Sequence, residues 1–271
     1  MSDDLPIFLS AAEQIKRQLA DQPVTVHNLD GDTANSTRII DEMNEAKPDR
    51  LIAIGLLAAQ LGTQLDDIPM VFCYVFNYEE HDLLSTSANG VNLLPPFEMQ
   101  LEAWKTLSPD LNRVGVIIGP MQEALIDEIQ QAADSKEIEL LARTVNSDQE
   151  ALYSFQRITP EIEGLWLVPD NRILSPRVVG EIMSYARNHR IQVVVFGRRM
   201  LEMGALMAVT TIDEDVAAQV VARLDQLDID GQFREPAMAP LTEMHVDINP
   251  TVARELGLVE SEQSARLERI K

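Results

Sequence analysis

Positive charge is scarce in this sequence, and that scarcity limits its partners. Lysine and arginine together number 22, against 44 aspartates and glutamates, so the formal net charge is −22 at pH 7. A surface this acidic repels phosphate backbones, which argues against nucleic acid as a partner. The four histidines are scattered without the spacing of a metal site, so no metal is expected.

Cysteine is scarcer still. Cys73 is the only cysteine among 271 residues, so no disulfide can form within the chain. It lies in the apolar run "MVFCYVF", where a buried and unreactive thiol is expected, because reactive thiols need a partly exposed, electropositive setting.

Long hydrophobic runs are also missing. The most apolar stretch, residues 51–61, is too short for a membrane span, which takes about 20 residues. The start of the chain, "MSDDLPIFLSAAEQIKR", is acidic and then amphipathic, unlike a signal peptide. Either the protein is cytoplasmic, or the sequence begins after processing.

The common catalytic motifs are absent. The chain contains no G-x-G-x-x-G, no G-x-x-x-x-G-K-[ST] and no G-x-S-x-G. Nothing in the sequence supports an enzyme, so we expect neither catalytic activity nor a cofactor.

Apolar strands alternate with amphipathic helices along most of the chain. Residues 24–29, 50–55, 69–75 and 90–94 are predicted strands, and the same rhythm continues in "RVGVIIG", "GLWLVPD" and "IQVVVFG". Continuous apolar strands are typical of sheets that are buried on both faces, and strands that alternate with helices form parallel sheets. The strands fall into two sets, before and after about residue 92. The pattern therefore predicts an α/β fold with two Rossmann-like parallel-sheet lobes.

Ligands of open parallel sheets bind at the carboxyl ends of the strands. Gly55 and Gly119 each follow a predicted strand. A glycine there allows close approach to the backbone, so the free N–H groups of the next helix can hold an anion. The alternative is a glycine that only makes a tight turn.

Charged and polar residues follow two later strands. Asp170 and Asn171 could bind a ligand amine or hydroxyl, or could form a turn before Ser175, the expected cap of the next helix. Arg198 could make a forked contact with a ligand carboxylate, or belong to a solvated loop.

The ordered segments "RLIAIGLLAAQL", "DIPMVFCYVFN", "ANGVNLL", "LNRVGVIIGP", "LWLVPDNRILS" and "MHVDINPTVARELGL" resemble ABC-transporter substrate-binding proteins. That family is similar to type I periplasmic binding proteins and includes tryptophan- and tyrosine-type amino-acid receptors. The resemblance implies two lobes with a cleft between them. One lobe would contain residues 1–91 and 210–238, and the other residues 92–209 and 239–271.

The resemblance also implies a function: a monomeric, periplasmic protein that captures an amino acid or related carboxylate by hinge closure and docks on a membrane permease. Including Arg198 from the charge argument, the expected ligand-binding residues are Gly55, Leu56, Asn77, Leu93, Pro120, Gln122, Asp170, Asn171, Gly197 and Arg198.

This sequence departs from the family pattern in three ways that matter. Family members start with a strand before the first helix, whereas "SDDLP" is typical of the turn after such a strand. Either the sequence begins after that strand, or another segment fills its place. The family often has Thr where this chain has Leu56, and often has Asp-Pro near Asn77-Tyr78. Leu93-Leu94 replaces a Thr-Gly pair, so we expect a more apolar pocket with fewer donors for a ligand carboxylate. An alternative is therefore a sensory or interaction module of the same fold, with an altered or lost ligand pocket.

Overall fold

The computed structural model describes residues 1–32, 35–65, 68–76, 78–120, 123–170, 172–227, 232–258 and 269–270. The chain forms two compact units, each with its own sheet. Unit 1 contains residues 1–94 and 211–242, and unit 2 contains residues 95–210 and 243–271. The predicted α/β fold with parallel sheets is confirmed.

Unit 1 is built on a four-stranded parallel sheet with the order β1-β2-β3-β9. These strands are β1 (Leu51–Ile54), β2 (Met70–Cys73), β3 (Ala88–Val91) and β9 (Met238–Ala239). Every residue of β2 and β3 is buried, as the continuous apolar run predicts for a strand covered on both faces.

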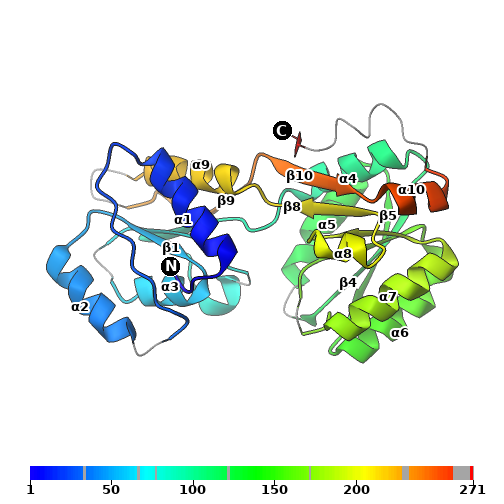
Figure 1. Ribbon diagram of the computed structural model, residues 1–271, viewed down its shortest axis with the longest axis horizontal. Coiled ribbons are helices and arrows are strands. Elements are labelled where there is room, and N and C mark those ends of the chain that lie inside the picture. The colour runs from blue at the N-terminus through cyan, green and yellow to red at the C-terminus, as the bar shows by residue number, and fades with distance from the viewer. Residues whose placement is uncertain are drawn as a thin grey trace. The chain divides into compact units, whose positions relative to one another are not determined.

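Successive side chains of β2 point to opposite faces of the sheet, and helices cover both faces. Val71 and Cys73 pack with α1 (Pro6–Gln18) and α9 (Asp213–Leu224), which lie together on one face (Figure 1). Met70 and Phe72 face the side covered by α3 (Leu56–Gly62), and α2 (Ser36–Ala46) packs against α3. A short 3-10 helix, Tyr78–His81, follows β2.

The strand predicted over residues 24–29 is wrong. This segment runs beside α1 without regular strand pairing, and β1 is the terminal strand of the described sheet. The sequence of the segment suits a strand, but a strand needs a neighbour to pair with, and the space between this segment and β1 is a cavity.

Unit 2 has a seven-stranded sheet with the order β11-β10-β8-β7-β6-β4-β5. Its strands are β4 (Arg113–Ile118), β5 (Glu139–Thr144), β6 (Gly164–Leu167), β7 (Gln192–Val195), β8 (Met207–Thr210), β10 (Met244–Ile248) and β11 (Arg269–Ile270). All pairs are parallel except those of β10, which runs antiparallel to β8 and β11. The chain leaves unit 2 after β8 and re-enters it before β10, so these two neighbouring strands run in opposite directions.

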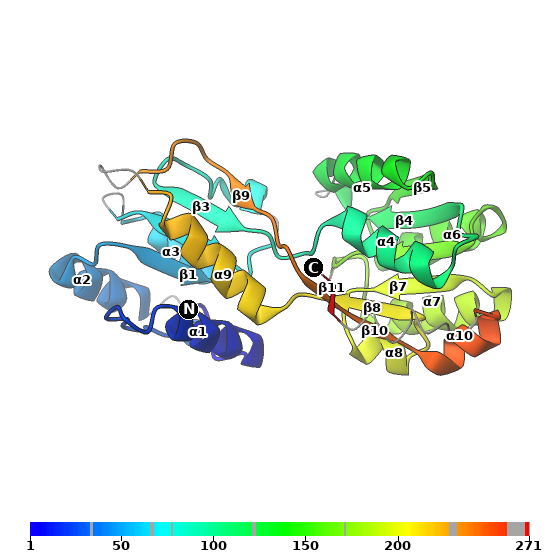
Figure 2. The same ribbon diagram turned by 90° about the horizontal axis from the view of Figure 1, so that it is seen from above.

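Helices cover both faces of the unit 2 sheet (Figure 2). α4 (Phe97–Leu107) packs with α5 (Glu123–Ser135), and α6 (Asp148–Ile158) packs with α7 (Pro176–His189). α8 (Arg199–Glu202), α10 (Pro250–Leu256) and a 3-10 helix, Thr159–Glu161, also belong to this unit.

Caps and aromatic side chains behave in unit 2 as the sequence predicts. Ser175 caps α7 by accepting the N–H of Val178. Trp104 and Trp166 are core residues, 0% and 1% exposed, and the Trp104 indole donates to the side chain of Gln192. A Cβ on Gly164 would lie 2.2 Å from the Trp104 ring, so glycine is required there by close packing.

Candidate functional site at the strand ends

Two of the predicted residues of unit 1 follow β1 directly. Gly55 has φ of 86°, a conformation that favours glycine, and it leads into α3 at Leu56. A Cβ on Gly55 would lie 2.7 Å from Ser2 Oγ and 2.9 Å from the Phe8 ring. Gly55 is therefore required both by its backbone conformation and by the side chains packed against it.

The amides beyond Gly55 are the expected anion-binding groups. Ser2 Oγ accepts the N–H of Ala58 at 2.9 Å, although the two residues lie 56 positions apart in the chain. A protein side chain thus takes one of the N–H groups at the start of α3, as a helix cap does. The ligand-binding role of Gly55 stays a prediction.

Leu56 and Leu93 are half-buried and face apolar surroundings. Leu56 packs against the cluster on the α3 side of the sheet, and Leu93 packs against the cluster under α1 and α9. The Leu93 carbonyl accepts the hydroxyl of Thr211 at 2.6 Å, which joins two of the segments where the chain passes between the units. Asn77 lies outside the described residues.

A hydrogen-bonded cluster at the end of β2 was missed in the sequence. Tyr74 directly follows β2, is 7% exposed and has φ of 57°. Its hydroxyl and that of Ser10 both donate to the Asp213 carboxylate, in the first turn of α9. Burial, and then the hydrogen bond with Asp213, raise the pKa of Tyr74, so this phenol stays protonated.

The predicted residues of unit 2 follow three neighbouring strands. Pro120 comes after β4, Asp170 after β6, and Gly197 and Arg198 after β7. Because β7, β6 and β4 are adjacent and parallel, these residues lie along one edge of the sheet. Gln122 and Asn171 lie outside the described residues.

Asp170 makes a turn and holds an arginine. Its side chain is 1% exposed and forms a forked ion pair with Arg172, at 3.0 Å to Nε and 3.2 Å to the terminal nitrogen. Asp170 Oδ1 also accepts the Arg172 amide, and Asp170 O accepts the amide of Leu174, so the expected turn is present. A Cβ on Gly119 would lie 2.3 Å from Asp170 Oδ2. The structure thus brings Gly119, Asp170 and Arg172 together.

Arg172 also lies at this edge, although it is not among the residues that the sequence predicted to bind ligand. Its side chain is 39% exposed, and the buried carboxylate fixes the orientation of its guanidinium. The signal was available: an Asp and an Arg two residues apart at a strand end can pair across a tight turn.

Arg198 interacts with two side chains of unit 2. Its Nε donates to Asp247 at 2.5 Å, and its terminal nitrogen contacts His245, both on β10. Its side chain is 61% exposed. A Cβ on Gly197 would meet nothing within 4 Å, so close packing within the structure does not require glycine there.

A large cavity lies elsewhere, beside β1 in unit 1. Its volume is about 970 Å³, and none of the described residues expected to bind ligand is among its lining residues. Within the described part of the chain, no group of three or more His, Cys, Asp and Glu could hold a metal ion, and no helix is long and apolar enough to cross a bilayer.

Comparison of the sequence with known protein families gives a match that covers most of the chain. The model of a family described as ABC transporter substrate binding protein matches residues 11–265. No curated protein matched the sequence.

Similar solved structures share the fold at low sequence identity. One is an "ABC domain" from Streptococcus pneumonia in complex with L-Trp, with 18% identity, TM-score 0.64, and coverage of 98% of this chain and 95% of the other. Another is a ligand-free, open substrate binding protein with adhesive properties from Clostridium difficile, with 16% identity, TM-score 0.74, and coverage of 96% and 94%. A third is a conserved domain protein from Vibrio cholerae, with 18% identity, TM-score 0.62, and coverage of 98% and 95%.

Proposed function

Because this chain belongs to the family of ABC transporter substrate-binding proteins, we propose that it captures an amino acid or a related carboxylate for the permease of an ABC transporter. The family is a class of binding proteins, generally without enzymatic activity. One observation carries the proposal for the ligand site: in each unit, parallel strands bring glycines and polar side chains to a single sheet edge.

The charged groups at those edges suit the two ends of an amino acid. In unit 2, the Arg172 guanidinium is held in place by Asp170 and is partly exposed, which suits a ligand carboxylate. In unit 1, Asp213 offers a carboxylate that suits an ammonium group, beside the hydroxyls of Tyr74 and Ser10. Phe8 stacks edge to face on Tyr74, with ring centroids 6.2 Å apart, and adds an apolar surface there.

Capture requires more than contact with one unit. In this proposal, a ligand that binds residues of both units stabilises a closed arrangement relative to an open one, through a hinge motion. A shift from mostly open to mostly closed takes a differential affinity of about 5 kcal/mol. Proteins of this family are typically found outside the cytoplasm, and we propose that this one acts in the periplasm as a monomer.

The test is a thermal-shift screen of the purified chain against amino acids and related small carboxylates, followed by calorimetry on any hit. Tryptophan belongs in the panel because one similar structure holds L-Trp. A ligand that binds the native state raises the melting temperature in proportion to the logarithm of its concentration.

Two arginine variants locate the site. Arg172→Ala should weaken binding of a carboxylate ligand by about tenfold or more, because a charge-assisted contact is lost. Arg113→Ala is the matched control: Arg113 also pairs with a carboxylate, Glu163, but it lies at the opposite, amino end of β4. Equal losses in the two variants would contradict a site at the carboxyl ends of the strands.

A sensory or interaction module of the same fold is the second candidate. The observation that favours it is in unit 1, where Ser2 and Phe8 cover Gly55 and where Leu56 packs into the apolar cluster. A protein that keeps the fold without a ligand would show no shift with any amino acid or carboxylate. A flat screen would therefore favour this candidate over transport.

A further inference from the structure

The chain passes between the two units three times: between residues 94 and 95, between 210 and 211, and between 242 and 243. A hinge motion must be absorbed at such passages, because the packed sheets and helices on either side resist deformation. The unit 1 side of each passage is held by hydrogen bonds within that unit. These bonds decide where the chain can bend.

The first and third passages are joined through the sheet of unit 1. β3 pairs with β9, and directly after β3 the amide of Asn92 donates to Ala239 O at 2.9 Å. The second passage is joined to the first by a side chain, since the Thr211 hydroxyl donates to Leu93 O at 2.6 Å. Beyond Ala239, however, the third passage leaves the sheet before it reaches residue 242.

A buried carboxylate holds the third passage at that point. Asp215, in the first turn of α9, is 5% exposed. The Thr242 amide donates to Asp215 Oδ2 at 2.7 Å, and the Thr242 hydroxyl donates to Asp215 Oδ1 at 2.8 Å. Gln219, one turn along α9, also donates to Oδ1, at 3.1 Å. Hydrogen bonds to an ionised acceptor are stronger than neutral ones, so Asp215 fixes Thr242 firmly to α9.

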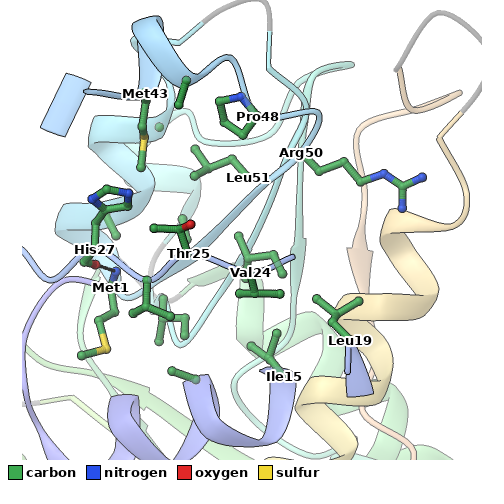
Figure 3. A pocket seen from close by; sticks show the side chains of 18 of the residues that line it. Met1, Ile15, Leu19, Val24, Thr25, His27, Met43, Pro48, Arg50 and Leu51 are labelled. Carbon is green, nitrogen blue, oxygen red and sulfur yellow. Dashed lines mark hydrogen bonds between the residues drawn. The ribbon is translucent and has the colours of Figure 1, made fainter. Parts of the chain in front are cut away.

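The helix α9 has a fixed place in unit 1. Its buried face, which includes Val216 and Val220, packs in one apolar cluster with Ile15 and Leu19 of α1. Figure 3 shows Ile15 and Leu19 beside α9, at the border of the cavity. Because α9 begins two residues after Thr211, Asp215 ties the third passage to the helix that follows the second one. All three passages are thereby connected within unit 1.

The unit 2 side of the passages is also held close to the boundary. Thr210 pairs with His245 in the ladder of β8 and β10, so residues 243 and 244 separate this pair from Thr242. On the first passage, the carbonyl of Pro95 accepts the side chain of Gln100 at 2.7 Å, and Gln100 is 6% exposed. Bonds on both sides thus leave short lengths of chain to absorb a rotation.

We propose, on the basis of the hinge motion in the proposed function, that Asp215 is a positioning residue of the hinge. By holding Thr242 against α9, it confines bending on the third passage to residues 243 and 244, and so limits the arrangements that the two units explore. In this role Asp215 touches no ligand. It strengthens capture indirectly, because an apparent dissociation constant rises as the fraction of competent molecules falls.

The test measures the spread of distances between the units in the absence of ligand. Asn44→Cys on α2 and Asn188→Cys on α7 place one spin label on an exposed position of each unit, while Cys73 is 0% exposed and stays unlabelled. Pulsed electron paramagnetic resonance then gives the distribution of distances between the labels. Asp215→Ala should widen this distribution by about half or more, because the third passage gains residues that can bend.

Asn89→Ala is the matched control. Asn89 is 0% exposed, and its side chain donates to Glu235 O at 3.2 Å and accepts the Ala237 amide at 3.0 Å. This variant also loses buried hydrogen bonds of unit 1, but at the amino end of β9, whereas Thr242 follows the carboxyl end. Its distance distribution should match that of the parent chain, which separates a hinge role from a general loss of stability.

Two substitutions at Thr242 sharpen the assignment. Thr242→Ser keeps both donors to Asp215 and should give the parent distribution, whereas Thr242→Val keeps the shape but loses the hydroxyl and should give an intermediate width. Because Thr242→Val removes the hydroxyl alone, it also carries the test if Asp215→Ala does not fold. The proposal is overturned if neither Asp215→Ala nor Thr242→Val widens the distribution, or if Asn89→Ala widens it equally.

The proposed function and the hinge assignment can fail separately. If the screen of amino acids and carboxylates gives a hit, Asp215→Ala should weaken its binding by about threefold or more, and Asn89→Ala should leave it unchanged. A flat screen together with a widened distribution would overturn capture of these ligands and support the hinge assignment. A hit together with equal widths in the parent and Asp215→Ala would support capture and overturn the hinge assignment.

Discussion

The sheets of the two units are built by the same alternation of strands and helices, but they are completed to different degrees. In unit 2, β4 and β6 have a strand on each side, and Phe155 and Trp166 are at most 1% exposed. In unit 1, β1 ends the described sheet beside a cavity of about 970 Å³. Packing density sets the contribution of a core to stability, so unit 2 should be the more stable unit.

The carboxyl ends of the strands also differ between the two units. Unit 2 presents a partly exposed arginine held by a buried carboxylate, whereas in unit 1 the side chains of Ser2 and Phe8 cover Gly55. If the proposed function holds, the recognition of a ligand carboxylate would therefore depend mainly on Arg172 of unit 2.

The largest expected effect comes from a matched pair of leucines. Leu165 is 0% exposed in the core of unit 2, and Leu61 is 6% exposed and lines the cavity in unit 1. Leu165→Ala should lower the free energy of unfolding by about 4 kcal/mol, near the upper part of the range for buried leucines. Leu61→Ala should cost only about 2 kcal/mol, because a side chain beside a cavity already has fewer partners.

Hydrogen exchange during denaturant titration measures both changes and assigns each to its unit, since two units need not unfold together. Equal costs for the two substitutions would mean that the cavity does not weaken the core of unit 1.

The next effect concerns the carboxylate that orients Arg172. Asp170→Asn keeps an acceptor for the Arg172 amide but removes the ion pair. Breaking a fully buried pair costs about 3–5 kcal/mol, but Arg172 is 39% exposed and water solvates part of its charge. We therefore expect a loss of about 1–3 kcal/mol in the free energy of unfolding.

The control is Glu163→Gln, which removes the carboxylate facing Arg113 at the other end of β4. That pair is 3.8 Å apart and both side chains are about a third exposed or more, so the loss should stay within about 1 kcal/mol. Chemical denaturation of both variants measures the difference, and a larger loss for Glu163→Gln would contradict the assigned role of Asp170.

The α/β architecture was predictable from the sequence. Strands that are buried on both faces, such as β2, β4 and β6, are continuous apolar runs, and such runs are visible in the sequence. The cap at Ser175 was predictable for a similar reason, since a serine followed by proline is a local signal. The direction of β10 was not predictable from the alternation, because it depends on where the chain passes between the units.

The sites were harder to predict because they depend on the last residue of each strand. The strand predicted over residues 69–75 runs two residues beyond Cys73, and this hid Tyr74 as a strand-end residue. Its partner Asp213 lies 139 positions away, and the cap of α3 comes from Ser2, so neither contact has a local signal. Asn77, Gln122 and Asn171 fall outside the described residues and stay predictions.

A third, smaller effect compares two serine caps. Ser175 caps α7 from the adjacent position in the chain, whereas Ser2 accepts the Ala58 amide from a distant segment. Ser175→Ala should cost about 1–2 kcal/mol in unit 2, and Ser2→Ala about 1 kcal/mol in unit 1. Thermal denaturation detects both, and a larger cost for Ser2→Ala than for Ser175→Ala would contradict this order.

The smallest effect appears only in alkali and belongs to unit 1. Burial raises the pKa of Cys73 to about 12, whereas an unfolded chain has the ordinary value near 9. Between these values the unfolded state releases a proton that the native state keeps, so the free energy of unfolding falls as pH rises, by at most about 1.4 kcal/mol per pH unit for this group. At pH 7 the thiol is protonated in both states and contributes nothing. The raised pKa of Tyr74 acts in the same direction at higher pH.

Urea denaturation of the native chain and of Cys73→Ala from pH 7 to pH 10 measures this contribution. The substitution should lower stability at pH 7 through lost packing and should flatten the decline above pH 9. Hydrogen exchange should place the difference in the strands β1 to β3 and leave β4 to β8 unchanged, because the described core residues that cluster with Cys73 all belong to unit 1. An equal alkaline decline in both chains would show that Cys73 already titrates in the native state, which a thiol enclosed by α1, α9 and β1 cannot do without opening that unit.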